Sequence, residues 1–132
     1  MSNRVFVGYD TREDIAYQVC EHSIWQHNKD IEVIPLKQKE LRDNKLYWRG
    51  EDKLASTEFT FTRFLIPHLM NYEGWALFCD SDIVFLEDVD NLFALADDKY
   101  AVMCVQHDYT PKPGTKMDGQ VQTQYPRKNW SS

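Results

Sequence analysis

The sequence predicts an α/β fold with a mainly parallel central sheet flanked by helices. Short apolar runs alternate along the chain with segments of helical periodicity, which is the order of βαβ units. One run, Trp75–Cys79, is apolar at every position, as is typical of a strand covered on both faces of a parallel sheet. A chain of 132 residues is long enough for one such core.

Four runs rich in β-branched, aromatic and aliphatic residues predict the strands. The first is closed by Gly8, and the second contains Pro35 near its end. The third is expected in the interior of the sheet because it has no polar face. The four expected strands are Val5–Val7, Ile31–Leu36, Trp75–Cys79 and Ala101–Gln106.

Capping residues and apolar spacing predict helices between these strands. The first, Glu13–His27, follows a possible cap at Asp10 or Thr11. The charged stretch Lys37–Leu54 predicts an irregular segment with a short helix at Lys39–Asp43. A longer helix is expected from Ser56 or Thr57 to Met70, ended or kinked by Pro67. It would turn inward four side chains, Phe61, Phe64, Leu65 and Leu69, and a last helical turn is expected at Val89–Leu95.

Composition excludes several functional classes. The net charge of −6 and the pI near 5.1 argue against nonspecific binding to nucleic acid or to a membrane surface. No apolar run reaches the roughly 18 residues of a membrane span, and the polar N-terminus does not resemble a signal peptide. Cys20, Cys79 and Cys104 lie far apart and form no CxxC pair. They predict buried free thiols and a cytoplasmic location.

Two aspartates interrupt an apolar stretch. Asp80 and Asp82 follow the predicted strand Trp75–Cys79, and the residues Ile83–Leu86 after them are apolar again. The simpler interpretation is a solvated turn at the strand end. The alternative is a site for Mn²⁺ or Mg²⁺, because hard cations prefer carboxylate oxygens and keep positions open for phosphate.

Two further segments are candidates for a binding site. Gly8-Tyr9-Asp10 follows the first predicted strand, and ligands of parallel sheets bind beyond the carboxyl ends of the strands. Arg63 lies 17 residues before Asp80, in an apolar context. Its guanidinium is either an ion-pair partner for one of the aspartates or a contact for a phosphate or sugar.

Three stretches, "VFVGYD", "STEFTFTRFLIPHL" and "WALFCDSDIVFLEDVDNLF", resemble the metal-dependent nucleotide-sugar glycosyltransferases of the GT-A fold, with the retaining family 8 type as the most similar group. The resemblance covers Val5 to Gln106 and implies a Rossmann-like nucleotide-binding half. It implies transfer of a sugar, expected from a UDP-linked donor, to an unknown glycan or other acceptor.

The resemblance also assigns roles to individual residues. Asp80 and Asp82 would chelate Mn²⁺, or Mg²⁺, with the donor diphosphate, and Asp80 would also reach the ribose. Arg63 would steady the donor sugar or phosphate, completing a catalytic set with the two aspartates. The remaining donor contacts would be Ser81 near the nucleoside and, around the base and ribose, Gly8, Tyr9 and Asp10.

The resemblance further implies a domain division. Residues 1–106 would form the nucleotide-sugar-binding domain, and 107–132 would begin an acceptor-side or flap region. The family supplies a histidine as third metal ligand well after the DxD motif, for which His68 and His107 are poor substitutes. The chain is therefore expected to be truncated at its C-terminus.

Two alternatives remain open. The first is a non-catalytic remnant that binds a nucleotide sugar or a metal without an acceptor site. The second is a phosphatase of the haloacid-dehalogenase type, with Asp80 as nucleophile and Asp82 as acid/base. Against the phosphatase, 79 residues precede Asp80, and Ile83-Val84 stand where that class has Gly-Thr.

Overall fold

The computed structural model describes residues 2–51, 53–106, 114–115 and 121–122. The chain divides into two compact units, residues 1–96 and 97–132. In the described part of the second unit, the short strands β4 (Gly114–Thr115) and β5 (Val121–Gln122) pair in antiparallel fashion. All the candidate site residues belong to the first unit.

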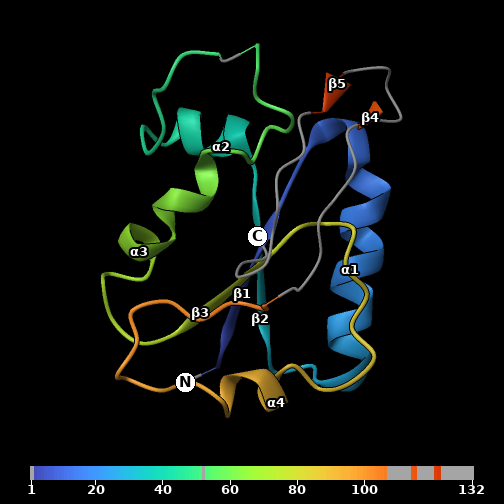
Figure 1. The fold of residues 1–132 in the computed structure, drawn as a ribbon, viewed down its shortest axis with the longest axis vertical. Coiled ribbons are helices and arrows are strands. Elements are labelled where there is room, and N and C mark those ends of the chain that lie inside the picture. Colours follow the sequence, from blue (N-terminus) through green and yellow to red (C-terminus); the bar gives the residue numbers. More distant parts are fainter. Residues whose placement is uncertain (1, 52, 107–113, 116–120, 123–132) are drawn as a thin grey trace. The chain divides into compact units, whose positions relative to one another are not determined.

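The first unit contains a three-stranded parallel sheet in the order β2-β1-β3 (Figure 1). The central strand β1 (Arg4–Gly8) pairs with β2 (Glu32–Leu36) on one side and with β3 (Ala76–Cys79) on the other. Pro35 lies in the edge strand β2, the position where a missing N–H donor is tolerated. The predicted α/β fold with a parallel sheet is confirmed.

Helices flank this sheet. A 3₁₀ turn η1 (Thr11–Glu13) leads into α1 (Asp14–His27), which lies on one side of the strands, and α3 (Ile66–Leu69) lies on the other (Figure 1). The predicted first helix is confirmed, but the Asp10 side chain caps the 3₁₀ turn η1 by accepting the N–H of Arg12, and α1 itself has no side-chain cap. The remaining helical segments are α2 (Gln38–Asp43), the 3₁₀ turn η2 (Thr62–Leu65) and α4 (Asp90–Phe93).

The side chains of β1 alternate between two buried faces. Val5 and Val7 pack against Cys20 and Ile24 of α1, whereas Phe6, between the two valines, points to the opposite face. All three β1 side chains are at most 1% exposed, and burying each one contributes on the order of 2 kcal/mol. The strand enclosed on both faces is therefore β1.

The prediction that Trp75–Cys79 lies in the sheet interior is wrong. In the described sheet β3 is an edge strand, and each of its side chains is only half-buried. Its uninterrupted apolar run reflects two half-covered faces: Leu77 and Cys79 pack against the core under α1, and Phe78 packs near Phe59 on the other face.

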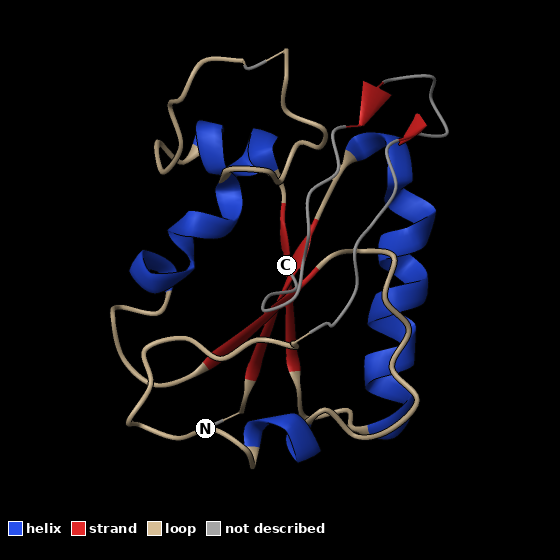
Figure 2. Cartoon of the chain, in the orientation of Figure 1, coloured by secondary structure: helices blue, strands red, loops and turns tan. Residues whose placement is uncertain are grey.

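The predicted helix from Ser56 to Met70 is only half correct. Helical structure begins at Thr62, after a long loop from α2, and Pro67 lies in the first turn of α3, where its missing N–H costs nothing (Figure 2). The Thr60 hydroxyl bonds back to the Thr57 carbonyl and so competes with helical pairing. Phe64, expected to point inward, is 74% exposed.

Two further expectations fail in the second unit. Residues 101–106 form no strand, because no neighbouring strand among the described residues pairs with them, and their side chains are exposed. Cys104 is a free thiol as predicted, but it is exposed rather than buried. His107 lies outside the described residues.

In the described part of the chain, no helix is both long enough and apolar enough to cross a bilayer.

Gly8 tests the packing at the end of β1. A Cβ added to Gly8 would lie 2.5 Å from the ring of Phe59, which is 4% exposed and has little room to move. We expect Gly8→Ala to lower the free energy of unfolding by about 1–3 kcal/mol, as overpacking does.

The matched control is Gly50→Ala, because an added Cβ there meets nothing within 4 Å. Urea denaturation should leave this control near the wild-type value, and Phe59→Leu should restore part of the stability lost in Gly8→Ala. Equal unfolding free energies for Gly8→Ala and wild type would contradict the close packing.

Candidate functional site

The parallel sheet brings two of the predicted site segments to the same edge. Val7 of β1 is paired with Cys79 of β3, so the residues that follow, Gly8 and Asp80, lie side by side at the carboxyl ends of these strands. Gly8-Tyr9-Asp10 and Asp80-Ser81-Asp82 therefore begin at the carboxyl ends of neighbouring strands. Such an edge is where parallel sheets bind ligands.

The two aspartates differ in environment. The Asp80 side chain is 34% exposed, whereas Asp82 is exposed and Ser81 between them is 2% exposed. Among the described residues, no group of three or more His, Cys, Asp or Glu side chains is arranged to hold a metal ion. The motif can thus offer two carboxylates, and any further ligands of a cation would come from elsewhere.

Arg63 approaches the first aspartate from the face opposite α1. Its Nη2 lies 3.8 Å from Asp80 Oδ1, and its Nε donates to the Phe59 carbonyl at 3.3 Å. The guanidinium carbon is 4.7 Å from the ring centroid of Phe78, within cation–π range. The ion pair with an aspartate is present, and at 3.8 Å it is loose enough to leave the guanidinium available to a ligand.

Asp10 is buried and its carboxylate is well supplied with donors. Oδ1 accepts the backbone N–H and Nε of Arg12, both at 2.9 Å, and Oδ2 accepts Nη2 of Arg12 at 2.7 Å and the N–H of Glu58 at 3.2 Å. The hydrogen bonds from Arg12 outweigh the effect of burial and lower the pKa of Asp10 to about 2. Asp10 therefore stays ionised, and it links the segment that follows β1 to the loop that contains Glu58.

Tyr9 is held by Asp14 of α1 and by Lys37, the residue that follows β2. Its hydroxyl donates to Asp14 Oδ1 at 2.6 Å, and this hydrogen bond raises the pKa of Tyr9. The Lys37 ammonium lies 5.0 Å from the centre of the Tyr9 ring. These contacts hold the ring in place directly after β1.

The thiols of Cys20 and Cys79 lie next to the segment Asp80-Ser81-Asp82, which we call the acidic motif. Hydrogen bonding with the Cys20 thiol, and after it burial, raises the pKa of Cys79, whereas the same pairing lowers the pKa of Cys20. Cys79 therefore remains a neutral thiol, and it adds no negative charge beside the carboxylates of Asp80 and Asp82.

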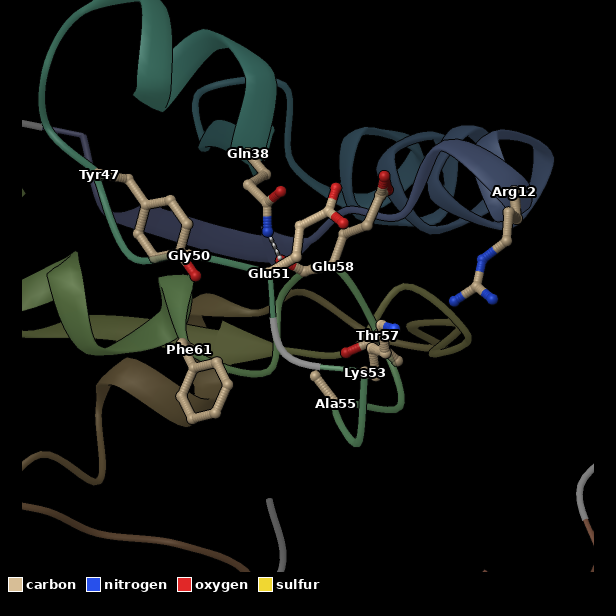
Figure 3. Close-up of a pocket in the computed structure, with 10 residues that line it drawn as sticks. All are labelled: Arg12, Gln38, Tyr47, Gly50, Glu51, Lys53, Ala55, Thr57, Glu58 and Phe61. Carbon is tan, nitrogen blue, oxygen red and sulfur yellow. Dashed lines mark hydrogen bonds between the residues drawn. The ribbon is translucent and has the colours of Figure 1, made fainter. Parts of the chain in front are cut away.

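A cavity of about 210 Å³ opens beside Arg12 of η1 (Figure 3). Arg12 lies at one end of it and Tyr47 and Phe61 at the other, while Gln38 Nε2 donates to the Glu58 carbonyl across its wall. The full lining is Arg12, Gln38, Tyr47, Gly50, Glu51, Lys53, Ala55, Thr57, Glu58 and Phe61.

Sequence reasoning missed the part played by Arg12, Tyr47 and Glu58. The predicted irregular stretch 37–54 with a short helix is confirmed in its described residues, but Tyr47 within it is only 9% exposed, and the Arg42 guanidinium carbon lies 4.6 Å from its ring centre. The aromatic residue inside a charged segment was the available signal, because a solvated loop rarely needs one.

Comparisons with known proteins found a family and a relative that this chain resembles. The family model described as "Glycosyl transferase family 8" matches residues 9–131. The chain is 62% identical over 130 residues to Protein CDI of Arabidopsis thaliana, an alignment that covers 98% of this chain and 50% of that protein. The chain thus spans about half the length of this curated relative. No solved structure gives a significant match.

The ionised state of Asp10 makes stability depend on pH. Its folded pKa of about 2 lies below the value near 4 of an unfolded chain, so its contribution is complete above about pH 4 and is lost as pH falls toward 2. The shift corresponds to roughly 2 kcal/mol at neutral pH.

We expect Asp10→Asn to lower the free energy of unfolding at pH 7 and to converge on wild type between pH 4 and 2. Urea denaturation at several pH values measures this difference. Asp43→Asn, which removes a carboxylate exposed beside Lys39, is the control and should change stability far less. A difference that persists undiminished at pH 2 would show that Asp10 is not held ionised by Arg12.

Proposed function

This chain belongs to glycosyl transferase family 8, and on that basis we propose that it binds a nucleotide sugar through a divalent cation and takes part in transferring the sugar to an acceptor. The expected donor is UDP-linked and the expected outcome is retention at the anomeric carbon. For the acceptor we propose only a class, a glycan or another hydroxyl-bearing molecule.

One observation carries this proposal: the acidic motif Asp80-Ser81-Asp82, the first loop Gly8-Tyr9-Asp10 and Arg63 converge at one edge of the sheet. Asp80 and Asp82 offer hard oxygen donors at the end of β3, beside Gly8-Tyr9-Asp10 at the end of β1. Within the part of the chain that the structure describes, no third protein ligand joins these two carboxylates, and such a pair suits Mn²⁺ or Mg²⁺, which commonly take other ligands from substrate phosphates and water. The residues present therefore fit the implied cation.

The chain's own residues divide the work of binding. Asp80 and Asp82 would hold the cation, which when bound supplies Lewis-acid neutralisation of the departing diphosphate. From its position beside Asp80, Arg63 would meet the donor sugar or phosphate. Ser81 would lie close to the nucleoside, and Gly8 and Tyr9 would form the wall of the base and ribose pocket, with Asp10 behind them.

Family membership disfavours the phosphatase alternative, which nothing in the site favours. Binding without transfer remains the second candidate for this chain, because it spans about half of its relative. Turnover of a UDP-sugar would separate transfer from binding alone. The cytoplasmic location and the domain division at residue 106 stay predictions.

The metal role of the motif is tested by Asp82→Asn. This change keeps the shape of the side chain but removes a negative charge from the cation's ligands. We expect Mn²⁺-dependent affinity for UDP to fall at least tenfold, about 1.4 kcal/mol. Stability without metal should hold or rise, because two nearby carboxylates repel when no cation lies between them.

Calorimetric titration with UDP, in Mn²⁺ and in EDTA, measures the affinity, and Asp43→Asn serves as the control for loss of a surface carboxylate. Equal UDP binding in EDTA and Mn²⁺ would refute a metal-bridged donor. An Asp82→Asn protein that keeps the full Mn²⁺ dependence would remove this residue from the metal site.

The role of Arg63 is tested by Arg63→Lys. Lysine keeps the positive charge but loses the planar fork that can bind two oxygens. If the guanidinium contacts the sugar, the variant should bind a UDP-sugar several-fold more weakly while its affinity for free UDP changes less. Unchanged affinity for both ligands would leave Arg63 only its ion pair with Asp80.

A further inference from the structure

Two loops at the site are joined by a reciprocal exchange of hydrogen bonds. Glu58 donates its backbone N–H to Asp10 Oδ2 at 3.2 Å, and its own carboxylate accepts the backbone N–H of Thr11 at 2.6 Å. The Thr11 hydroxyl adds a contact to Glu58 Oε1 at 2.9 Å, and Arg12 Nη2 donates to the Ser56 carbonyl at 3.3 Å. We call Asp10, Thr11, Arg12 and Glu58 the loop clamp.

The loop clamp fixes a segment that has little regular structure of its own. Residues 44–61 contain no helix or strand, apart from the undescribed residue 52. The bonds to Asp10, Thr11 and Arg12 tie this segment to η1, which is anchored to the central strand. Charge-assisted hydrogen bonds of this kind are stronger than neutral ones, so the two loops are held as one unit.

Phe59, the residue after Glu58, connects the loop clamp to Arg63 and the acidic motif. The Phe59 ring packs onto Gly8, and the Phe59 carbonyl accepts Nε of Arg63 at 3.3 Å. Arg63 Nη2 in turn lies 3.8 Å from Asp80 Oδ1. A continuous series of contacts therefore leads from Glu58, through the Phe59 backbone and the Arg63 guanidinium, to Asp80.

We propose that Asp10 and Glu58 are positioning residues, which hold the Phe59 segment so that Arg63 lies beside Asp80 in the geometry that donor binding requires. This inference rests on the proposed function. It assigns to Asp10 a task other than touching the nucleoside, because its carboxylate oxygens are already engaged by Arg12 and Glu58. Glu58 acts on the donor only through Arg63.

Glu58→Gln is the informative variant, since it preserves size but removes the charge that receives the Thr11 N–H and hydroxyl. We expect Mn²⁺-dependent UDP-sugar affinity to fall roughly fivefold, within the range of coupling between contacting residues. The same change made in the Arg63→Lys background should have little further effect. A clamp that acted on the donor independently of Arg63 would instead give additive losses in the two backgrounds, and one that served stability alone would leave the affinity of the folded protein unchanged.

A second measurement does not depend on the donor. The Arg63 Nε–H signal in ¹⁵N NMR spectra reports directly on its bond to the Phe59 carbonyl. We expect this signal to shift or to exchange faster with water in both Glu58→Gln and Asp10→Asn. Glu32→Gln is the matched control, because it removes a carboxylate from the exposed pair with Arg4 at the amino ends of β1 and β2.

The two measurements separate the two proposals. Wild-type protein that binds no UDP-sugar with Mn²⁺ overturns the proposed function and the donor-binding role of the clamp with it. An Arg63 Nε–H signal unchanged in both variants overturns the link from the clamp to Arg63, whatever the donor does. Additive affinity losses in the Arg63→Lys background also overturn it, and Asp10→Asn repeats the comparison if Glu58→Gln does not fold.

Discussion

The parallel pairing of β1 with both of its neighbours determines where the site lies. Because all three strands run in one direction, their carboxyl ends meet at a single edge. The first loop, near the start of the chain, and the acidic motif, about 70 residues later, are brought together by the pairing of Val7 with Cys79. Burial of Val5, Phe6 and Val7 holds this arrangement, since shifting β1 by one residue would turn Phe6 toward α1.

A buried charge near this edge requires further order. Asp10 is 1% exposed, and an ion so enclosed is costly unless donors surround it. Arg12 and the Glu58 backbone supply those donors, and as a consequence a loop without helix or strand is fastened to the sheet. The electrostatic requirement of one side chain thus accounts for the placement of residues 56–61, and through Phe59 for that of Arg63.

The acidic motif combines two environments within three residues. Asp80 lies partly buried beside a guanidinium, and Asp82 is exposed. The Cys79 thiol, which stays neutral, directly precedes Asp80, and the aromatic rings of Phe59 and Phe78 lie beside Arg63, so weakly polar groups adjoin this ion pair. Electrostatic interactions are stronger in such surroundings than in water. A cation bound there would therefore interact strongly with Asp80, and a phosphate with Arg63.

The sequence by itself determined the strands of the sheet, the first helix and the acidic motif at a strand end, because these follow from local apolar patterning and capping. It also carried the family resemblance, since that depends on residue identity and spacing. Only the tertiary structure decided that β1 rather than β3 is the enclosed strand, that residues 56–61 form a loop, and that 101–106 form no strand. These outcomes depend on partners distant in sequence, such as Asp10 for Glu58 and Gly8 for Phe59, and no local pattern encodes such contacts.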